Sequence, residues 1–185
     1  MTRRRRSQIN LIEARRNYRV SYQKSVSAGV KDASRCRRLE REPKLSIWKR
    51  NLDLQDIAER FAGTLPGHFG IRIKAIGADF IEAEMPVDER HIQPMGLLHG
   101  GASVVLSETL GSVATNLTLG PLQFAVGIEV NANHIASVRA GETVTAICRP
   151  LQVGGKVQVW QTEIRRADGK LACVSRLTTQ VLDKR

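Results

Sequence analysis

The stretch that most constrains the fold is residues 101–117, GASVVLSETLGSVATNL. It is too long for one strand and too rich in small residues for a surface helix, so we predict a helix that is buried on most sides. Leu106, Leu110, Val113 and Leu117 recur at helical spacing and form an apolar stripe along it. Any fold for this chain must therefore cover such a helix.

A second stripe of this helix carries a carboxylate, Glu108, among small and hydroxyl-bearing residues: Gly101, Val105, Ser112 and Thr115. A buried carboxylate is unfavourable unless it is paired or hydrogen-bonded. No Lys or Arg occurs between Arg90 and Arg139 to pair with it locally. We therefore predict a functional role for Glu108, the alternative being a structural glutamate that faces a subunit partner.

The flanking segments alternate between helix and strand patterns. Apolar residues at helical spacing predict an amphipathic helix over 54–61, with Asn51 or Asp53 as its cap, and TLPGHFG then breaks the chain. Period-two patterns predict six strands, at 71–76, 79–87, 124–135, 142–153, 156–167 and 170–182. The glycines of VGGK and ADGK are expected to supply positive φ in the turns between the last three. This order predicts an α+β fold, an antiparallel sheet with its helices on one face.

The basic charge is concentrated at the N-terminus. Residues 1–45 contain 14 of the 29 Lys and Arg residues but 4 of the 18 acidic ones, so they carry a net charge of +10 and residues 46–185 carry +1. Residues 1–45 lack a steady apolar period, and we predict a disordered extension before one folded domain at 46–185. A start codon assigned too far upstream is the favoured explanation for it. The alternatives are an Arg-rich targeting peptide and an arm that binds polyanions.

Cysteine usage and hydropathy favour a cytoplasmic protein. Cys36, Cys148 and Cys173 are odd in number and match no disulfide framework and no metal or redox motif. No apolar run approaches the roughly 20 residues that span a bilayer. We therefore expect no membrane partner and no metal, and for the near-neutral folded domain no nucleic acid.

The residues just before the long helix suit the stabilisation of negative charge. His99, Gly100 and Gly101 would place bare backbone N–H groups at the positive end of the helix dipole, and glycine lets another group approach closely. Such amides can stabilise a developing oxyanion. An oxyanion site at the helix start and a carboxylate at Glu108 together suit attack on a carbonyl group.

Three segments carry a family resemblance: QPMGLLHGGASVVLSETLGS, GIEVNANHI and VWQTEI. They are similar to hotdog-fold acyl-CoA thioesterases of the 4-hydroxybenzoyl-CoA and 1,4-dihydroxy-2-naphthoyl-CoA hydrolase type. The resemblance covers about residues 47–182. It implies an antiparallel sheet wrapped around a long central helix, homodimers that pair into homotetramers, and active sites that lie between subunits.

The resemblance also implies a role for each residue of the central motif. Glu108 takes the place of the catalytic carboxylate, acting as nucleophile or as general base toward water. Gln93 and the backbone N–H of Gly100 polarise the thioester carbonyl, and His99 orients the site. Ser112, one turn after Glu108, helps to hold the water or the substrate.

Two further segments resemble the family's substrate contacts. His134 matches a residue near the acyl and pantetheine channel, the alternative being an ordinary strand histidine. Gly154, Gly155 and Lys156 resemble a coenzyme A contact, in which two backbone N–H groups and an ammonium group face phosphate. The alternative for these three residues is a plain hairpin turn. No metal or other cofactor is required, because a thiolate leaves without a strong general acid.

The implied activity is hydrolysis of an aromatic acyl-CoA, with 1,4-dihydroxy-2-naphthoyl-CoA of menaquinone biosynthesis as the leading substrate. A broad-specificity acyl-CoA or aryl-CoA thioesterase is the alternative within the same class. A non-catalytic acyl-CoA-binding module and a nucleic-acid binder acting through residues 1–45 are alternatives from other classes. Glu108 argues against the former, and the near-neutral domain argues against the latter.

Overall fold

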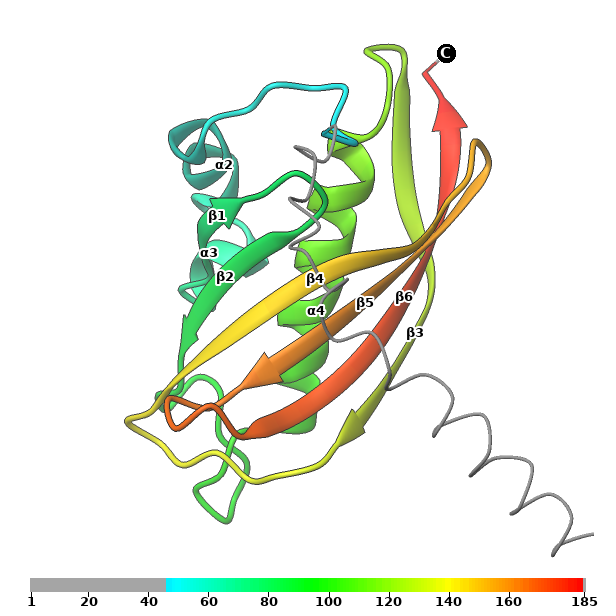
Figure 1. The fold of residues 1–185 in the computed structure, drawn as a ribbon. Helices are drawn as coiled ribbons and strands as arrows, with labels where there is room; N and C mark the ends of the chain where they lie inside the picture. The colour runs from blue at the N-terminus through cyan, green and yellow to red at the C-terminus, as the bar shows by residue number, and fades with distance from the viewer. Residues whose placement is uncertain (1–45, 185) are drawn as a thin grey trace, which may run out of the picture. The chain divides into compact units, whose positions relative to one another are not determined.

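The long helix is present as α4, Gly100–Leu117, and a six-stranded antiparallel sheet curves around it (Figure 1). The computed structural model describes residues 46–184, so the extension predicted for residues 1–45 lies outside the described residues. The sheet order is β1-β2-β4-β5-β6-β3, which leaves β1 and β3 as the edges. The strands are β1 (Arg72–Ile76), β2 (Ile81–Pro86), β3 (Gln123–His134), β4 (Thr143–Val153), β5 (Val157–Arg165) and β6 (Leu171–Asp183). The predicted α+β architecture is confirmed.

The core lies between α4 and the concave face of the sheet. Leu106, Leu110 and Leu117 are buried on the helix, and they meet the alternate residues of the strands that turn inward, among them Val144, Ala146, Cys148, Trp160 and Ile164. Gly111 allows the sheet to approach closely, because a methyl group there would lie 2.6 Å from Leu177 Cδ2. The apolar stripe of the helix therefore packs against the inward-facing residues of the strands, as the periodicities of the sequence predict.

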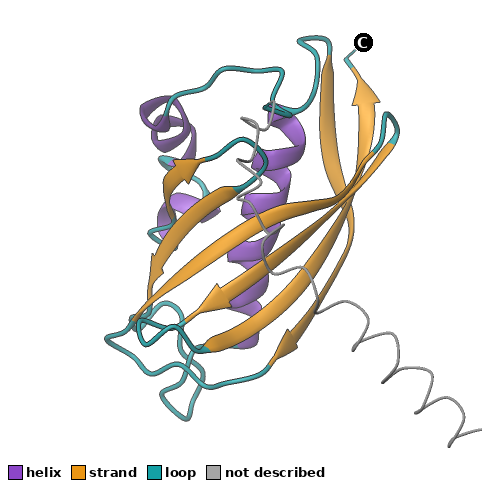
Figure 2. Ribbon diagram, in the orientation of Figure 1, coloured by secondary structure: helices purple, strands orange, loops and turns teal. Residues whose placement is uncertain are grey.

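The shorter helices cover one side of α4 (Figure 2). Helix α2, Leu54–Phe61, begins at Asp53, whose side chain accepts a hydrogen bond from the Asp56 N–H in a capping box. The next segment, predicted only as a break, contains the single helical turn α3, Leu65–His68, because Pro66 suits a helix start. No helix among the described residues is long and apolar enough to cross a membrane.

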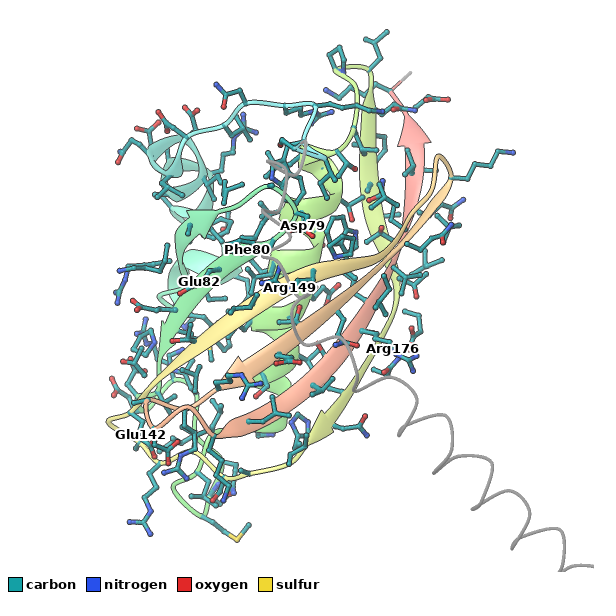
Figure 3. All side chains as sticks on the ribbon, in the orientation of Figure 1. Asp79, Phe80, Glu82, Glu142, Arg149 and Arg176 are labelled. Carbon is teal, nitrogen blue, oxygen red and sulfur yellow. The ribbon has the colours of Figure 1, made fainter. Side chains whose placement is uncertain are left out.

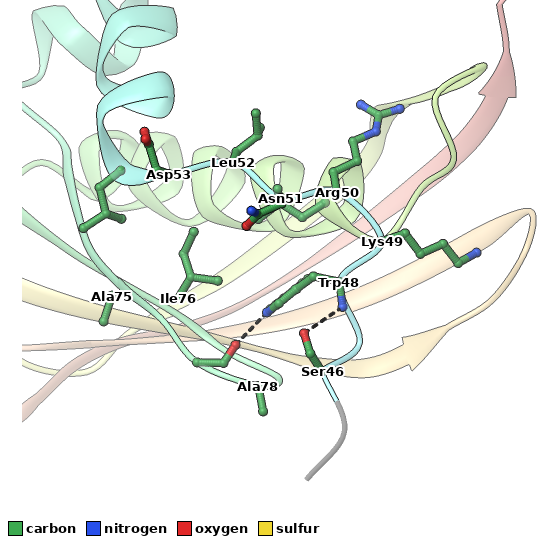
Figure 4. Close-up of a pocket in the computed structure, with 13 residues that line it drawn as sticks. Ser46, Trp48, Lys49, Arg50, Asn51, Leu52, Asp53, Ala75, Ile76 and Ala78 are labelled. Carbon is green, nitrogen blue, oxygen red and sulfur yellow. Dashed lines mark hydrogen bonds between the residues drawn. The ribbon is translucent and has the colours of Figure 1, made fainter. Parts of the chain in front are cut away.

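Residues Ile47–Arg50 bind two parts of the fold together (Figure 4). The Trp48 indole Nε1 donates to Gly77 O at 2.6 Å, and its ring stacks on buried Trp160 with centroids 6.0 Å apart. The backbone N–H groups of Lys49 and Arg50 both donate to Leu117 O. This N-terminal segment therefore anchors the β1–β2 turn and the C-terminal end of α4.

The two predicted glycine turns differ in backbone conformation. Gly169, in the β5–β6 turn, has φ +81°, as predicted. The prediction of positive φ is wrong for Gly154 and Gly155 in the β4–β5 turn. Gly154 is required there for space, because a methyl group would lie 2.5 Å from Val157 O.

Candidate active site

The N-terminus of α4 leaves one backbone donor free. His99 is the N-cap, and its Nδ1 accepts a hydrogen bond from the Gly101 N–H at 2.8 Å. Because Nδ1 is an acceptor, the proton of the neutral ring is on Nε2. The Gly101 N–H is therefore already used, whereas the Gly100 N–H has no acceptor among residues 46–184. Of the two glycine amides, only that of Gly100 can serve an oxyanion.

The loop before α4 is held in place by a buried histidine. His91 is 1% exposed; its Nε2 donates to Phe69 O at 3.0 Å, and its Nδ1 accepts from the Asp88 N–H at 3.1 Å. The carbonyl of His91 in turn accepts from the His99 N–H at 2.7 Å. A hydrogen bond from the Arg90 side chain holds the pKa of Asp88 well below its usual range. His91 thus links the helix start to the α3 segment.

Gln93, Gly100 and His134 line one cavity of about 290 Å³. The Gln93 side-chain carbonyl accepts from the Met95 N–H at 2.6 Å, which leaves its NH₂ group as the available donor. His134, at the end of β3, lies directly against Gly100, since a methyl group on Gly100 would be 2.6 Å from His134 Nε2. The structure therefore brings three of the predicted site residues together at one cavity, and two of them, Gln93 and Gly100, have an available N–H donor.

Glu108 lies elsewhere on α4 and is exposed in the single chain, so the prediction that it is buried is wrong for the protomer. The reason is that β3 is an edge strand and that an open cavity, lined by Phe61, Leu65 and Pro66, lies between this face of α4 and the α2–α3 segment. Glu108 and Ser112, which are one turn apart on α4, line the same cavity of about 360 Å³. Within residues 46–184 the Glu108 carboxylate forms neither a hydrogen bond nor an ion pair. Its carboxylate oxygens are therefore not engaged by these residues and can contact a bound molecule.

The Glu108 carboxylate lies against a glycine in β3. A methyl group on Gly127 would be 3.1 Å from Glu108 Oε1, tighter than ordinary van der Waals contact. The pairing of β3 with β6 has a bulge immediately after Gly127. Sequence reasoning missed Gly127, although a glycine inside a strand pattern is a recognised mark of close approach or of a bulge.

The two groups of predicted residues are separated within one chain. Glu108 is eight residues after Gly100, which corresponds to about 12 Å along the helix axis. The cavity of Gln93, Gly100 and His134 shares no lining residue with the cavity of Glu108 and Ser112. Within one protomer, the predicted oxyanion-binding residues and the predicted catalytic carboxylate therefore face different cavities.

The predicted coenzyme A turn lies at the other end of the helix. Gln158, beside this turn, bonds with Thr118 at the C-cap of α4, which is about 27 Å along the axis from Gly100. The Gly154 N–H donates to Val157 O at 3.2 Å, so it is not free to face phosphate. Lys156 is exposed. Of the predicted phosphate contacts, the Gly155 N–H and the Lys156 ammonium group remain available, and they are remote from the Gly100 end of their own chain.

A further cavity contains none of the predicted site residues. It has a volume of about 760 Å³ and lies beside Trp48 and the β1–β2 turn (Figure 4). Within residues 46–184, no three His, Cys, Asp or Glu side chains come close enough to bind a metal ion. Five of the predicted site residues therefore line the two other cavities beside α4: Gln93, Gly100 and His134 in one, and Glu108 and Ser112 in the other.

The chain belongs to the thioesterase superfamily, whose family model matches residues 95–173, and it is a thioester hydrolase. It is 51% identical over 136 residues to the 1,4-dihydroxy-2-naphthoyl-CoA hydrolase of Escherichia coli strain K12, a match that covers 74% of this chain and 99% of that protein. It is 46% identical over 136 residues to the proofreading thioesterase EntH of Cronobacter turicensis, covering 74% and 98%. The crystal structure of a Haemophilus influenzae thioesterase superposes with a TM-score of 0.72 at 47% identity and covers 74% and 95%.

Proposed function

We propose that this thioesterase hydrolyses an aromatic acyl-CoA to the free acid and CoA, with 1,4-dihydroxy-2-naphthoyl-CoA as the leading substrate. The proposal is carried by two complementary groups of residues: the donors of Gln93, before α4, and of Gly100, at its start, and the Glu108 carboxylate further along α4, which has no partner among residues 46–184. The relative from Escherichia coli supports the substrate, since that protein is named for it. A thioesterase of broader acyl-CoA specificity is the second candidate, since a relative of comparable identity has a different name, proofreading thioesterase EntH.

In the proposed reaction the thioester carbonyl oxygen accepts hydrogen bonds from the Gly100 N–H and the Gln93 NH₂ group. The positive end of the α4 dipole adds to their stabilisation of the oxyanion. Glu108 either attacks the carbonyl carbon or removes a proton from the attacking water, and Ser112 holds that water or the acyl group. The C–S bond then breaks and the electron pair leaves with sulfur as the CoA thiolate. In the nucleophilic route the acyl group remains on Glu108 as a mixed anhydride, which a water molecule hydrolyses to the free acid and the regenerated carboxylate. In the general-base route water forms the acid directly, and Glu108 then gives the proton it removed to the thiolate or to solvent.

We propose that each active site combines two chains. The 12 Å axial separation of Gly100 and Glu108 prevents one small carbonyl group from meeting both in one chain. Strand β3 offers a free edge of 12 residues with Phe124, Val126 and Ile128 exposed at 37%, 41% and 54%. A second copy that pairs antiparallel along β3 would run its α4 in the opposite direction. The start of one α4 would then approach Glu108 of the other.

Oligomers of this kind also give the β4–β5 turn a role. Gly155 and Lys156 are remote from Gly100 of their own chain, so we propose that they bind the phosphates of a CoA held at a site built by other copies. His134 remains a proposed contact of the pantetheine arm, because it lines the cavity of Gln93 and Gly100. A homodimer supplies the shared site and a homotetramer supplies further walls for the nucleotide.

Steady-state hydrolysis of a panel of CoA thioesters tests the proposal. The panel contains 1,4-dihydroxy-2-naphthoyl-CoA, benzoyl-CoA, hexanoyl-CoA and palmitoyl-CoA, and the readout is release of the free thiol. A kcat/KM for the naphthoyl thioester at least tenfold above the aliphatic ones supports the leading substrate. Equal values across the panel favour the broader specificity. No thiol release above the uncatalysed rate with any of them contradicts the proposed function.

A further inference from the structure

The loop of residues 91–99 carries the donors of the proposed oxyanion site. It folds back on itself, because the His99 N–H donates to His91 O at 2.7 Å. Gln93 lies inside this loop, and Gly100 follows it directly as the first residue of α4. The groups that hold residues 91–99 in place therefore also set the positions of both donors.

On one side, backbone groups hold the loop. The Leu98 N–H donates to Val138 O at 2.9 Å, and Leu97 forms an isolated β-bridge with Arg139. The Arg139 N–H donates in turn at 2.9 Å to the carboxylate of Glu142, at the end of the sheet where β4 begins (Figure 3). This anchor fixes the part of the loop that leads into α4.

On the side of α3, the ring of His91 holds the loop. The ring bridges two backbone groups, since its Nε2 donates to Phe69 O at 3.0 Å and its Nδ1 accepts from the Asp88 N–H at 3.1 Å. It also packs against the Phe69 ring, with centroids 5.0 Å apart. The residue is 1% exposed, so water does not replace these contacts. His91 thus attaches the loop to segments that lie before β1 and after β2.

Both partners of the His91 ring are themselves held in place. The Phe69 N–H donates to Leu65 O at 3.0 Å, at the end of α3. The Asp88 carboxylate accepts from Arg90 through Nε at 2.9 Å and through Nη2 at 2.5 Å, and Arg90 also donates to His68 O. Loss of the ring would therefore free the loop from a fixed support.

A neutral imidazole is suited to this buried bridge. It presents one donor and one acceptor on separate ring nitrogens and carries no charge. A charged side chain would be costly to bury here. An amide side chain has its donor and acceptor at one end, so it can replace only one of the two bonds. The position therefore depends on the chemistry of histidine as well as on its volume.

We infer that His91 is a positioning residue for the proposed reaction, and that its ring sets where the Gln93 NH₂ group and the Gly100 N–H meet the thioester oxygen. This inference rests on the proposed function. His91 acts through its neighbours: its carbonyl holds the N-cap residue of α4, and Gln93 is two residues further along the loop. A misplacement of about 1 Å in a catalytic group can cost roughly 10²-fold in rate.

Three variants at His91 test the inference, with thiol release from a CoA thioester as the assay. H91L makes neither bond, H91Q can donate to Phe69 O, and H91N can accept from the Asp88 N–H. The kcat of H91L should fall by roughly 10- to 100-fold while KM stays within about threefold, as expected for donors displaced in the transition state. H91Q or H91N should exceed the kcat of H91L by about threefold or more.

W48F is the control for a general loss of stability. The Trp48 indole donates to Gly77 O at 2.6 Å, beside the cavity that contains none of the predicted site residues. W48F loses this bond and should unfold at lower urea concentration, yet keep kcat within about twofold of the parent. Should H91L not fold, H91Q and H91N carry the same comparison. A folded His91 variant that lacks both bonds but keeps the parental kcat within about twofold overturns the inference, as does a kcat loss in W48F equal to that in the His91 variants.

Crystal structures of the parent and of the His91 variants distinguish failure of this inference from failure of the proposed function. No substrate is needed for this comparison. A displacement of Gln93 and of the Gly100 nitrogen by about 0.5 Å or more supports the inference even where no thioester is hydrolysed, because catalytic geometry tolerates roughly that much. Unchanged positions of both residues overturn it, whether or not the protein is an active thioesterase.

Discussion

Replacing Glu108 by Gln separates catalysis from folding, because Glu108 is exposed and has no partner among the described residues. The substitution keeps the size of the side chain but removes the basic, nucleophilic oxygen. An exposed side chain outside any network contributes within about 0.5 kcal/mol to stability, so the free energy of unfolding should stay nearly constant. If Glu108 is the nucleophile or general base, kcat should fall by roughly 10² to 10⁴.

That fall corresponds to about 2.7–5.4 kcal/mol of barrier, far more than any expected change in stability. The assay is thiol release under saturating substrate, together with urea unfolding and a measurement of oligomeric state on the same preparation. E163Q is the matched control, since Glu163 is a partly exposed glutamate on β5, away from the proposed β3 interface, and its carboxylate bonds to Arg165. It should keep kcat within about twofold of the parent.

A correctly assembled E108Q protein within about threefold of the parental kcat would refute the reasoning, because threefold is only ~0.7 kcal/mol. Gly127 supplies an independent check of the same geometry. A methyl group at Gly127 would lie 3.1 Å from Glu108 Oε1, so G127A must displace the carboxylate by a few tenths of an ångström. We expect kcat to fall about tenfold or more with a smaller change in KM, as for a displaced catalytic group.

Three other predictions concern the N-terminus, the shared site and a buried thiol. A protein that begins at Ser46 should keep its stability and activity, whereas further removal of residues 46–50 should lower the melting temperature, because Trp48 and its neighbours bind α4 and the β1–β2 turn. Equal stability of the two truncated proteins would show that these bonds contribute little. Mixed oligomers of E108Q and Q93A chains should regain activity, since half of the sites in a mixed dimer contain both native residues; mixed oligomers that stay inactive would place each site within one chain. Burial raises the pKa of Cys148 to about 12, so this thiol should resist iodoacetamide at pH 8 in the folded protein and react on unfolding. Rapid labelling in the native state, followed by mass spectrometry, would contradict its burial.

Local pattern was sufficient to predict the elements and the fold class. The predicted 101–117 helix differs from α4 by one residue at its start, and all six predicted strands are present within a few residues of their expected ends. The reason is that helical spacing and period-two alternation record which side chains turn toward a shared core. The residues to which the family motif assigns roles include Gln93, Gly100, Glu108 and Ser112, and these four likewise line cavities of the fold.

Tertiary structure alone decided how these residues are grouped. Sequence reasoning expected a buried Glu108 beside the Gly100 amide, but β3 lies at the sheet edge and leaves Glu108 exposed, facing a separate cavity. The exposure of a helical residue depends on which strands and helices cover its face, and local periodicity does not contain that information. A pattern along the chain reports the direction of a side chain, whereas long-range packing decides what that side chain meets.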